Sequence, residues 1–173
     1  MHNLKIYCMC LKNEYLESVK KHNYIPVGLK NKNFSSEWLT DDTLINISEK
    51  NPYYGEYTFY YWYWKNILKD KKKDDWIGFC SYRELWADKK DVADKYSTKS
   101  LLKSLPDEWK DYETIIGEPF KLKRPRVIKI LKHGKIALLR NLKEVFKANW
   151  SIRFQFDMFH GNGFLDKAIK LLP

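Results

Sequence analysis

The sequence predicts an α/β protein in which a mostly parallel sheet is flanked by helices. Two apolar segments with strand character, Leu4–Cys10 and Trp76–Cys80, are separated by a helical segment around residues 52–68. A strand, a helix and a second strand form a βαβ unit, whose strands run parallel and are buried on both faces. The 173 residues suffice for one domain with a sizeable core, so we expect a single domain over residues 1–173.

The elements before the central helix are short. Residues 13–21 are charged and predict a helix that Asn13 caps. Tyr24–Val27 predicts a second strand, and its proline favours a sheet edge or a strand start. Residues 31–44 are polar and predict an ordered loop.

The central helix is unusually aromatic, since nine of the twelve residues from Tyr53 to Trp64 are aromatic. Asn51 followed by Pro52 predicts an N-cap with proline at the first helical position. A helix that is apolar all round should be buried on several sides, which leaves Glu56 in need of a partner or a ligand. Such aromatic side chains build cores or form platforms for sugars and bases, and both readings stay open here.

The later elements are predicted from shorter patterns. We expect a short helix at 97–105, a third strand at 113–119, basic helices at 126–132 and about 142–148, a strand at 151–156, a glycine-punctuated loop at 157–163 and a closing helix at 164–172.

The net charge of +10 is concentrated in one segment. Residues 1–119, the expected α/β core, hold 19 basic and 19 acidic side chains, whereas residues 120–147 hold ten basic residues and one acid. This basic helical segment, followed by residues 148–173, favours a polyanionic neighbour, and we expect residues 121–147 to face an anionic membrane surface. A solvated lysine-rich face is the alternative.

Several functional classes lack their usual signals. The chain has no phosphate-binding glycine motif of the common kinds and no Asp-x-Asp pair, so neither a cofactor nor a divalent metal is supported. Cys8, Cys10 and Cys80 lie in apolar runs and predict buried free thiols. Without a signal-peptide pattern or a long apolar run, we expect a cytoplasmic protein, peripheral on the inner face of the membrane.

Two pairs of residues are candidates for chemistry. Tyr82 and Arg83 follow the strand at 76–80, where an arginine can bind a phosphate; in the alternative, Arg83 pairs with Glu84 or Glu56 and joins the sheet to the helix. Asp157 and His160 lie three residues apart beside two glycines and could activate a hydroxyl. The alternative for this pair is a helix cap and a loop histidine.

Several linked motifs resemble one family. They are Asp41-Asp-Thr43, Asn46-Ile-Ser48, Lys50-Asn-Pro52, Tyr54-x-Glu56, Tyr61-Trp-x-Trp-Lys-Asn66 and Ile77-Gly-Phe-Cys-Ser-Tyr-Arg83. Over roughly residues 4–86 the chain resembles an uncharacterised family from bacterial capsular polysaccharide and lipopolysaccharide gene clusters, usually described as glycosyltransferases. The later Phe156–Gly161 stretch is similar to a subset of these proteins.

The resemblance implies a GT-A-like, Rossmann-like fold, a nucleotide-sugar donor and a polysaccharide or lipid-linked acceptor. We expect Arg83, with Tyr82, to neutralise the leaving diphosphate, and Asp157 or His160 to take the acceptor proton. The remaining predicted donor-binding residues are Asp42, Asn46, Ser48, Asn51, Glu56, Lys65 and Asn66.

The chain departs from the family pattern at three positions, where Ile45, Ser81 and Glu84 replace an aspartate, a histidine and an arginine. Family members tend to run longer, which predicts that a chain ending at Pro173 is truncated on the acceptor side. Two rival functions remain. One is a non-catalytic remnant of the transferase fold, and the other is a basic nucleic-acid-binding module, disfavoured because the aromatic and basic segments are separate.

Overall fold

The computed structural model describes residues 3–29, 33–70, 75–87, 101–117, 139, 142–145, 147, 150–161 and 163–170. The chain divides into two compact units, Met1–Gly117 and Glu118–Pro173, and each is described by itself. This boundary lies two residues before the predicted end of the α/β core at residue 119. A single domain over residues 1–173 stays a prediction.

The first unit is built on a four-stranded parallel sheet with the strand order β3-β2-β1-β4. The strands are β1 (Asn3–Cys10), β2 (Ile25–Gly28), β3 (Leu39–Thr40) and β4 (Asp75–Ser81). The predicted βαβ unit is confirmed, because β1 and β4 pair in parallel from Asn3↔Asp75 to Met9↔Ser81. Pro26 is tolerated inside the sheet because β3 pairs only with the two residues that follow it, Val27 and Gly28.

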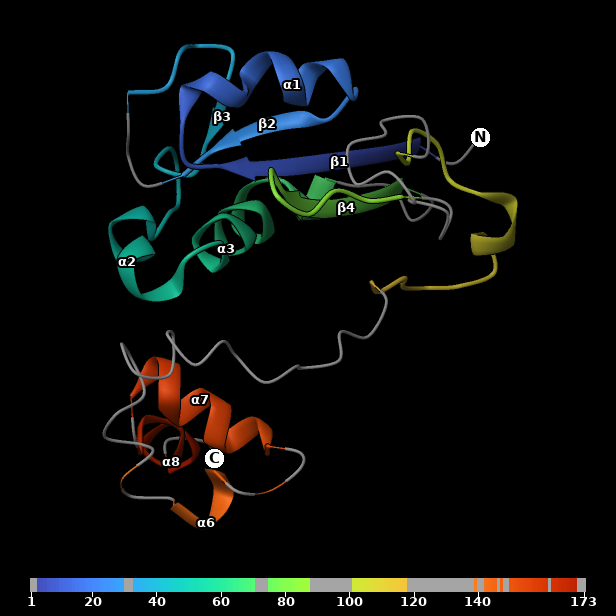
Figure 1. The fold of residues 1–173 in the computed structure, drawn as a ribbon. Helices are drawn as coiled ribbons and strands as arrows, with labels where there is room; N and C mark the ends of the chain where they lie inside the picture. The colour runs from blue at the N-terminus through green and yellow to red at the C-terminus, as the bar shows by residue number, and fades with distance from the viewer. Residues whose placement is uncertain are drawn as a thin grey trace. The chain divides into compact units, whose positions relative to one another are not determined.

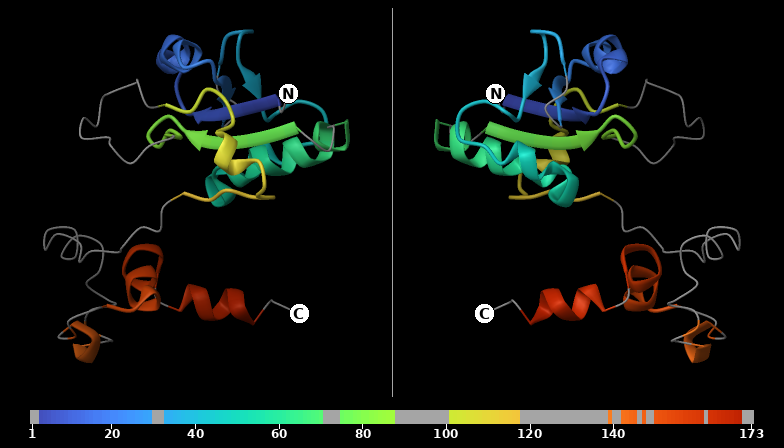
Figure 2. Two further views of the ribbon diagram at one scale, coloured as in Figure 1. Left: turned by 90° about the vertical axis from the view of Figure 1, so that its right-hand side faces the viewer. Right: turned by 90° about the vertical axis from the view of Figure 1, so that its left-hand side faces the viewer.

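Helices cover both faces of the sheet (Figure 1 and Figure 2). Side chains alternate along β1, so Ile6, Cys8 and Cys10 pack with α1 (Leu16–Lys21), and Tyr7 and Met9 pack with α3 (Tyr57–Asn66). The three cysteines are buried and free, as predicted. A parallel sheet flanked by helices is a Rossmann-like arrangement, which confirms the predicted α/β class with a mostly parallel sheet.

The entry to α1 differs from the prediction in one detail. The short 3-10 helix η1 (Asn13–Tyr15) begins at Asn13, but the Asn13 side chain does not cap it. Its amide nitrogen donates to the carbonyl of Asn33, and its oxygen accepts from the backbone N–H of Ser35 at 3.3 Å. Asn13 therefore holds the loop before β3 rather than the start of the helix.

The aromatic segment is broken into η2 (Ser48–Lys50), α2 (Asn51–Tyr54), α3 and η3 (Leu68–Asp70). The break falls at Gly55, whose φ of 55° and ψ of −128° suit glycine and few other residues. Helix α3 buries Thr58, Phe59, Trp62 and Tyr63, whereas Trp64 on its other side is 55% exposed. The prediction of a continuous helix buried on several sides is therefore wrong.

The described residues after β4, 82–87 and 101–117, contain one short 3-10 helix, η4 (Asp107–Trp109), and are otherwise irregular. An isolated bridge pairs Ala87 with Leu101, and the indole N–H of Trp86 donates to the carbonyl of Phe79 in β4 at 2.8 Å. The predicted helix is wrong over residues 101–105, and the predicted strand is wrong over residues 113–117. The other residues of these two elements lie outside the described part of the chain.

The second unit contains α6 (Leu142–Val145), α7 (Ile152–His160) and α8 (Phe164–Ile169). Helices near residues 142 and 164 are confirmed, but the predicted strand at 151–156 and the predicted loop at 157–160 are wrong, because both fall on α7. The hydroxyl of Ser151 accepts from the N–H of Phe154 at 3.1 Å, and Phe154 and Met158 are buried four residues apart. An N-cap and this helical spacing override the short alternating pattern. Residues 120–138, with the predicted helix at 126–132, lie outside the described residues.

Candidate functional site

A pocket of about 650 Å³ lies at the carboxyl ends of the strands. It is bounded by residues at or just after the ends of β1, β2 and β4 and by the α2–α3 connection. Ligands of open α/β proteins gather at this edge, and the volume falls within the range of small-molecule sites. The lining residues are Met9, Leu11, Leu29, Asn51, Pro52, Tyr53, Tyr54, Gly55, Glu56, Tyr57, Ser81, Tyr82, Arg83 and Glu84.

The turn after β4 places Arg83 at this pocket. The N–H of Tyr82 donates to the carbonyl of Met9 at 3.2 Å, so the pairing of β4 with β1 continues one residue past the strand. The hydroxyl of Ser81 accepts from the N–H of Arg83 at 3.4 Å, and the Tyr82 ring stacks on Tyr15 with 4.3 Å between the ring centroids. Ser81, a departure from the family pattern, thus helps to shape the turn.

Arg83 offers an accessible positive charge to the pocket. Its Nε donates to the Tyr82 hydroxyl at 2.8 Å, and this hydrogen bond raises the pKa of Arg83 further above its ordinary value. Glu56 acts on Arg83 electrostatically, but among the described residues no acidic side chain forms an ion pair with it. The alternative in which Arg83 pairs with Glu84 or Glu56 is therefore not supported by an ion pair in the described residues, and the guanidinium can receive an anionic ligand.

Three tyrosines also line the pocket, and the sequence reasoning missed them as site residues. Tyr53, Tyr54 and Tyr57 flank Gly55 and are 89%, 53% and 68% exposed. The break at Gly55 turns them away from the core that the rest of α3 joins. Glu56 lies between them and is exposed. Aromatic faces beside an arginine suit a ligand that has both a flat ring and an anionic group.

A series of hydrogen bonds between buried polar side chains supports the turn that carries these tyrosines. Asn51 donates through its amide nitrogen to the carbonyl of Gly55 at 2.7 Å and to the hydroxyl of Thr58 at 3.0 Å. The Thr58 hydroxyl in turn donates to Oδ2 of Asp41, which is 0% exposed, and Oδ1 of Asp41 has no hydrogen-bond partner in the described part of the chain. Asn51 thus holds the turn at Gly55, and Asp41 rather than Asp42 is the buried acid of the motif.

Replacing Asp41 with asparagine is expected to change the pH dependence of the free energy of unfolding. Burial raises the pKa of Asp41 above its ordinary value of 3.8, so the folded state holds this proton more tightly than the unfolded chain. The resulting stability is fully present below pH 3.8 and is lost as the pH rises through the folded pKa. The Asp41→Asn protein should therefore gain stability relative to the wild type as the pH rises above 3.8, measured by urea denaturation at a series of pH values. Parallel pH profiles would contradict this.

Five further predicted donor-binding residues do not line the pocket. Asn66 donates to the carbonyl of Ile45 at 2.9 Å and accepts from its N–H at 3.3 Å, which ties the end of α3 to the preceding loop. Asn46 accepts from the hydroxyl of Ser48 at 3.1 Å and donates to the carbonyl of Asp42 at 3.1 Å. Lys65 lies over the ring of Trp64, with 3.7 Å from Nζ to the ring centroid.

The hydrogen bonds of these motif residues therefore join two parts of the same unit. The loop motif and the end of α3 are distant in sequence but bond to each other through Asn66, and Trp62 adds a hydrogen bond from its indole N–H to the carbonyl of Thr43 at 2.9 Å. A donor-binding role for these five residues stays a prediction that the described pocket does not support.

Asp157 and His160 belong to the second unit. Both lie on α7, where a spacing of three residues places them on one side of the helix. Oδ1 of Asp157 accepts from the N–H of Gly163 at 3.2 Å, and the His160 ring stacks on Phe156 at 4.7 Å between centroids. These contacts favour a structural role in the turn before α8. A role in proton transfer stays a prediction.

Within the described ranges, no three histidine, cysteine, aspartate or glutamate side chains gather as metal ligands would. The described helices are also each too short or too polar to cross a bilayer. The predicted membrane-facing block lies largely outside the described residues, which include only 139, 142–145 and 147 of it.

The fold and the pocket define this protein as a parallel α/β protein with a pocket at the carboxyl ends of its strands. The chain belongs to the family described as Domain of unknown function (DUF4422), whose model matches residues 5–157. The match includes the whole pocket and ends on Asp157, three residues before His160. Neither the curated proteins nor the solved structures contain a match to this chain.

Proposed function

We propose that this protein is a GT-A-like glycosyltransferase that transfers a sugar from a nucleotide-sugar donor to a capsular or lipopolysaccharide-type acceptor. The observation that carries the proposal is the pocket at the strand ends, which is lined by an exposed arginine, without an ion-pair partner among the described residues, and by three exposed tyrosines. A nucleotide sugar needs both features, because its diphosphate is anionic and its base and sugar rings have flat faces.

Each lining residue has a role in this proposal. Arg83 binds the diphosphate and stabilises the negative charge that develops on it as the glycosidic bond breaks. The hydroxyl of Tyr82 orients the guanidinium. The exposed carboxylate of Glu56 accepts hydrogen bonds from ribose or sugar hydroxyls, and Tyr53, Tyr54 and Tyr57 pack against the rings of the donor.

The acceptor side of the proposal is a prediction from the sequence. We propose Asp157 or His160 as the group that takes the proton of the attacking hydroxyl, because carboxylates and imidazoles act as general bases. The basic residues of the 121–147 block bind the anionic surface of the membrane or the diphosphate of a lipid-linked acceptor at the cytoplasmic face.

Titration calorimetry against uridine and guanosine diphosphates and their sugars tests donor binding. We expect at least one nucleotide to bind with a dissociation constant in the range of about 1 μM to 1 mM, as is usual for enzyme substrates. Each titration is run with Mn²⁺ and with a chelator, which also reports whether the donor needs a metal. If no nucleotide binds under either condition, the proposal fails. If a nucleotide binds but no sugar is released or transferred, the protein is a non-catalytic binder.

A further inference from the structure

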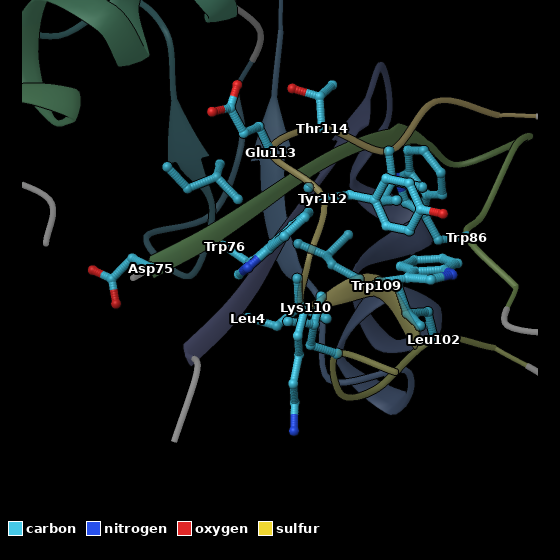
Figure 3. A pocket seen from close by; sticks show the side chains of 15 residues that line it. Leu4, Asp75, Trp76, Trp86, Leu102, Trp109, Lys110, Tyr112, Glu113 and Thr114 are labelled. Atoms are coloured by element: carbon cyan, nitrogen blue, oxygen red, sulfur yellow. The ribbon is translucent and has the colours of Figure 1, made fainter. Parts of the chain in front are cut away.

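A second pocket, of about 550 Å³, lies near the other end of the sheet (Figure 3). Its floor comes from the first residues of β1 and β4, and the segment from Leu102 to Ile115 covers it. Residues Leu4 and Cys10 of β1 are about 20 Å apart along the strand, at about 3.3 Å per residue. The second pocket is therefore separate from the pocket that contains Arg83.

The floor of this pocket combines four residues of β1 and β4. Leu4 pairs with Trp76, and Ile6 pairs with Gly78, so all four residues lie on one face of the sheet. A Cβ added to Gly78 would lie 3.1 Å from Cγ1 of Ile6, closer than such carbons usually approach. Glycine at position 78 therefore lets the Ile6 side chain pack closely against β4 in the floor.

The walls are aromatic and firmly held. Trp86 donates from its indole nitrogen to the carbonyl of Phe79 at 2.8 Å, and its own carbonyl accepts from the N–H of Leu102 at 3.0 Å. Trp109 and Tyr112 lie beside Trp86 in Figure 3, and Trp76 stands alongside them. Tyr112 is 61% exposed, so an aromatic face remains accessible to solvent.

The rim is polar but has no unpaired cation among its described residues. Lys110 forms an ion pair with Asp107 and extends away from the indoles. Glu113 and Thr114 are exposed and supply hydrogen-bond acceptors and a donor at the edge of the cavity. The pocket is therefore poorly suited to a phosphate or another polyanion. Flat apolar walls with hydroxyl-binding groups at the edge match a neutral sugar ring, whose faces carry C–H groups and whose edges carry hydroxyls.

We propose that this pocket binds a neutral sugar residue of a glycan chain, at a distance from the bond-forming site. This inference extends the proposed function, on which the biological role of the second pocket rests. In that role, the second pocket holds a polymeric acceptor away from the bond-forming site. Binding of the glycan itself needs only the aromatic walls and the rim, so it can be tested without any donor.

The test follows the seven tryptophan indole N–H signals by nuclear magnetic resonance during titration with cellohexaose, maltohexaose and chitohexaose. Single Trp→Phe variants assign the signals. We expect at least one glycan to shift the signals of Trp76 and Trp109 while the exposed Trp64, which lies outside the pocket, stays unchanged. If no glycan shifts the pocket signals, or if Trp64 shifts alone, the proposal is overturned.

Tyr112→Ala should weaken glycan binding about 3- to 10-fold, as expected from the loss of one stacked aromatic ring. Ile116→Ala is the matched control, because Ile116 is exposed on the same segment but does not line the pocket. An equal effect of the two variants would contradict the assignment. Stronger shifts with hexanol than with every glycan would identify an apolar occupant and also overturn it.

A further pair of variants separates this inference from the proposed function. Arg83→Ala should retain glycan binding, and Tyr112→Ala should retain nucleotide binding. If the wild type binds a glycan but no nucleotide, the donor site alone is refuted. Nucleotide binding without any glycan binding would refute the second pocket alone.

Discussion

Replacing Arg83 with alanine is expected to weaken the binding of uridine or guanosine diphosphate about 10- to 100-fold. A hydrogen bond to a charged group contributes about 1.5–3 kcal/mol, and every 1.4 kcal/mol or so changes a dissociation constant about tenfold. Arg83 is exposed and without an acidic partner among the described residues, so its removal should leave the fold intact. Calorimetry with the diphosphate that binds the wild type measures the effect.

Two control variants make this result specific. Lys69→Ala removes the same charge from the first unit at an exposed position outside the pocket, and it should change affinity less than about twofold. Arg83→Lys keeps the charge but loses the planar two-pronged donor, so its affinity should fall between those of the alanine variant and the wild type. Equal losses for Lys69→Ala and Arg83→Ala would show that only the overall charge matters, and that Arg83 is not a binding residue.

Replacing Phe59 with alanine is expected to cost about 3–5 kcal/mol of the free energy of unfolding. Phe59 is 0% exposed and packs between α3 and the sheet, with 5.6 Å to the ring centroid of Trp62 and 5.7 Å to that of Tyr7. A loss of this size is a large share of the stability of a typical domain, and the cavity cannot collapse easily among such large rings. Urea unfolding followed by near-ultraviolet circular dichroism, which reports packed aromatic side chains, measures it.

Trp64→Ala is the matched control for Phe59. It removes a larger ring from the same helix, but Trp64 is 55% exposed, so the expected cost is within about 1 kcal/mol. Phe59→Leu keeps most of the buried volume and should cost less than about 1.5 kcal/mol, which covers the case in which the alanine variant does not fold. If Trp64→Ala is as destabilising as Phe59→Ala, the assignment of the buried face of α3 is wrong.

The burial of the aromatic segment could be predicted only in part from the sequence. Nine aromatic residues among twelve indicated burial on several sides. In the structure, these residues are divided into a buried group and an exposed group. Gly55 ends α2, and α3 then turns Phe59, Trp62 and Tyr63 toward the sheet. The helical spacing of Phe59, Trp62 and Tyr63 was visible in the sequence, whereas the exposure of Tyr53, Tyr54 and Tyr57 depends on the break at Gly55.

The motif residues fall into two groups, one that lines the pocket and one that does not. Four of the predicted donor-site residues, Asn51, Glu56, Tyr82 and Arg83, line one pocket. The other motif residues of this region join the loop to α3 instead. A list of motifs cannot separate these two roles, because a side chain that holds a loop and a side chain that holds a ligand use the same amide and hydroxyl groups.

The βαβ unit, the parallel pairing of β1 with β4, the buried thiols and the position of Arg83 just after a strand can all be predicted from the amino-acid sequence. These features follow from local apolar patterns and from the rule that crossover connections join parallel strands. Other features are visible only in the folded chain: Asp41 is the buried acid, Asn66 bonds to Ile45, Arg83 has no acidic ion-pair partner among the described residues, and residues 102–115 cover a second pocket. These features depend on which side chains meet across long sequence separations, where packing and polar contacts outweigh local preference.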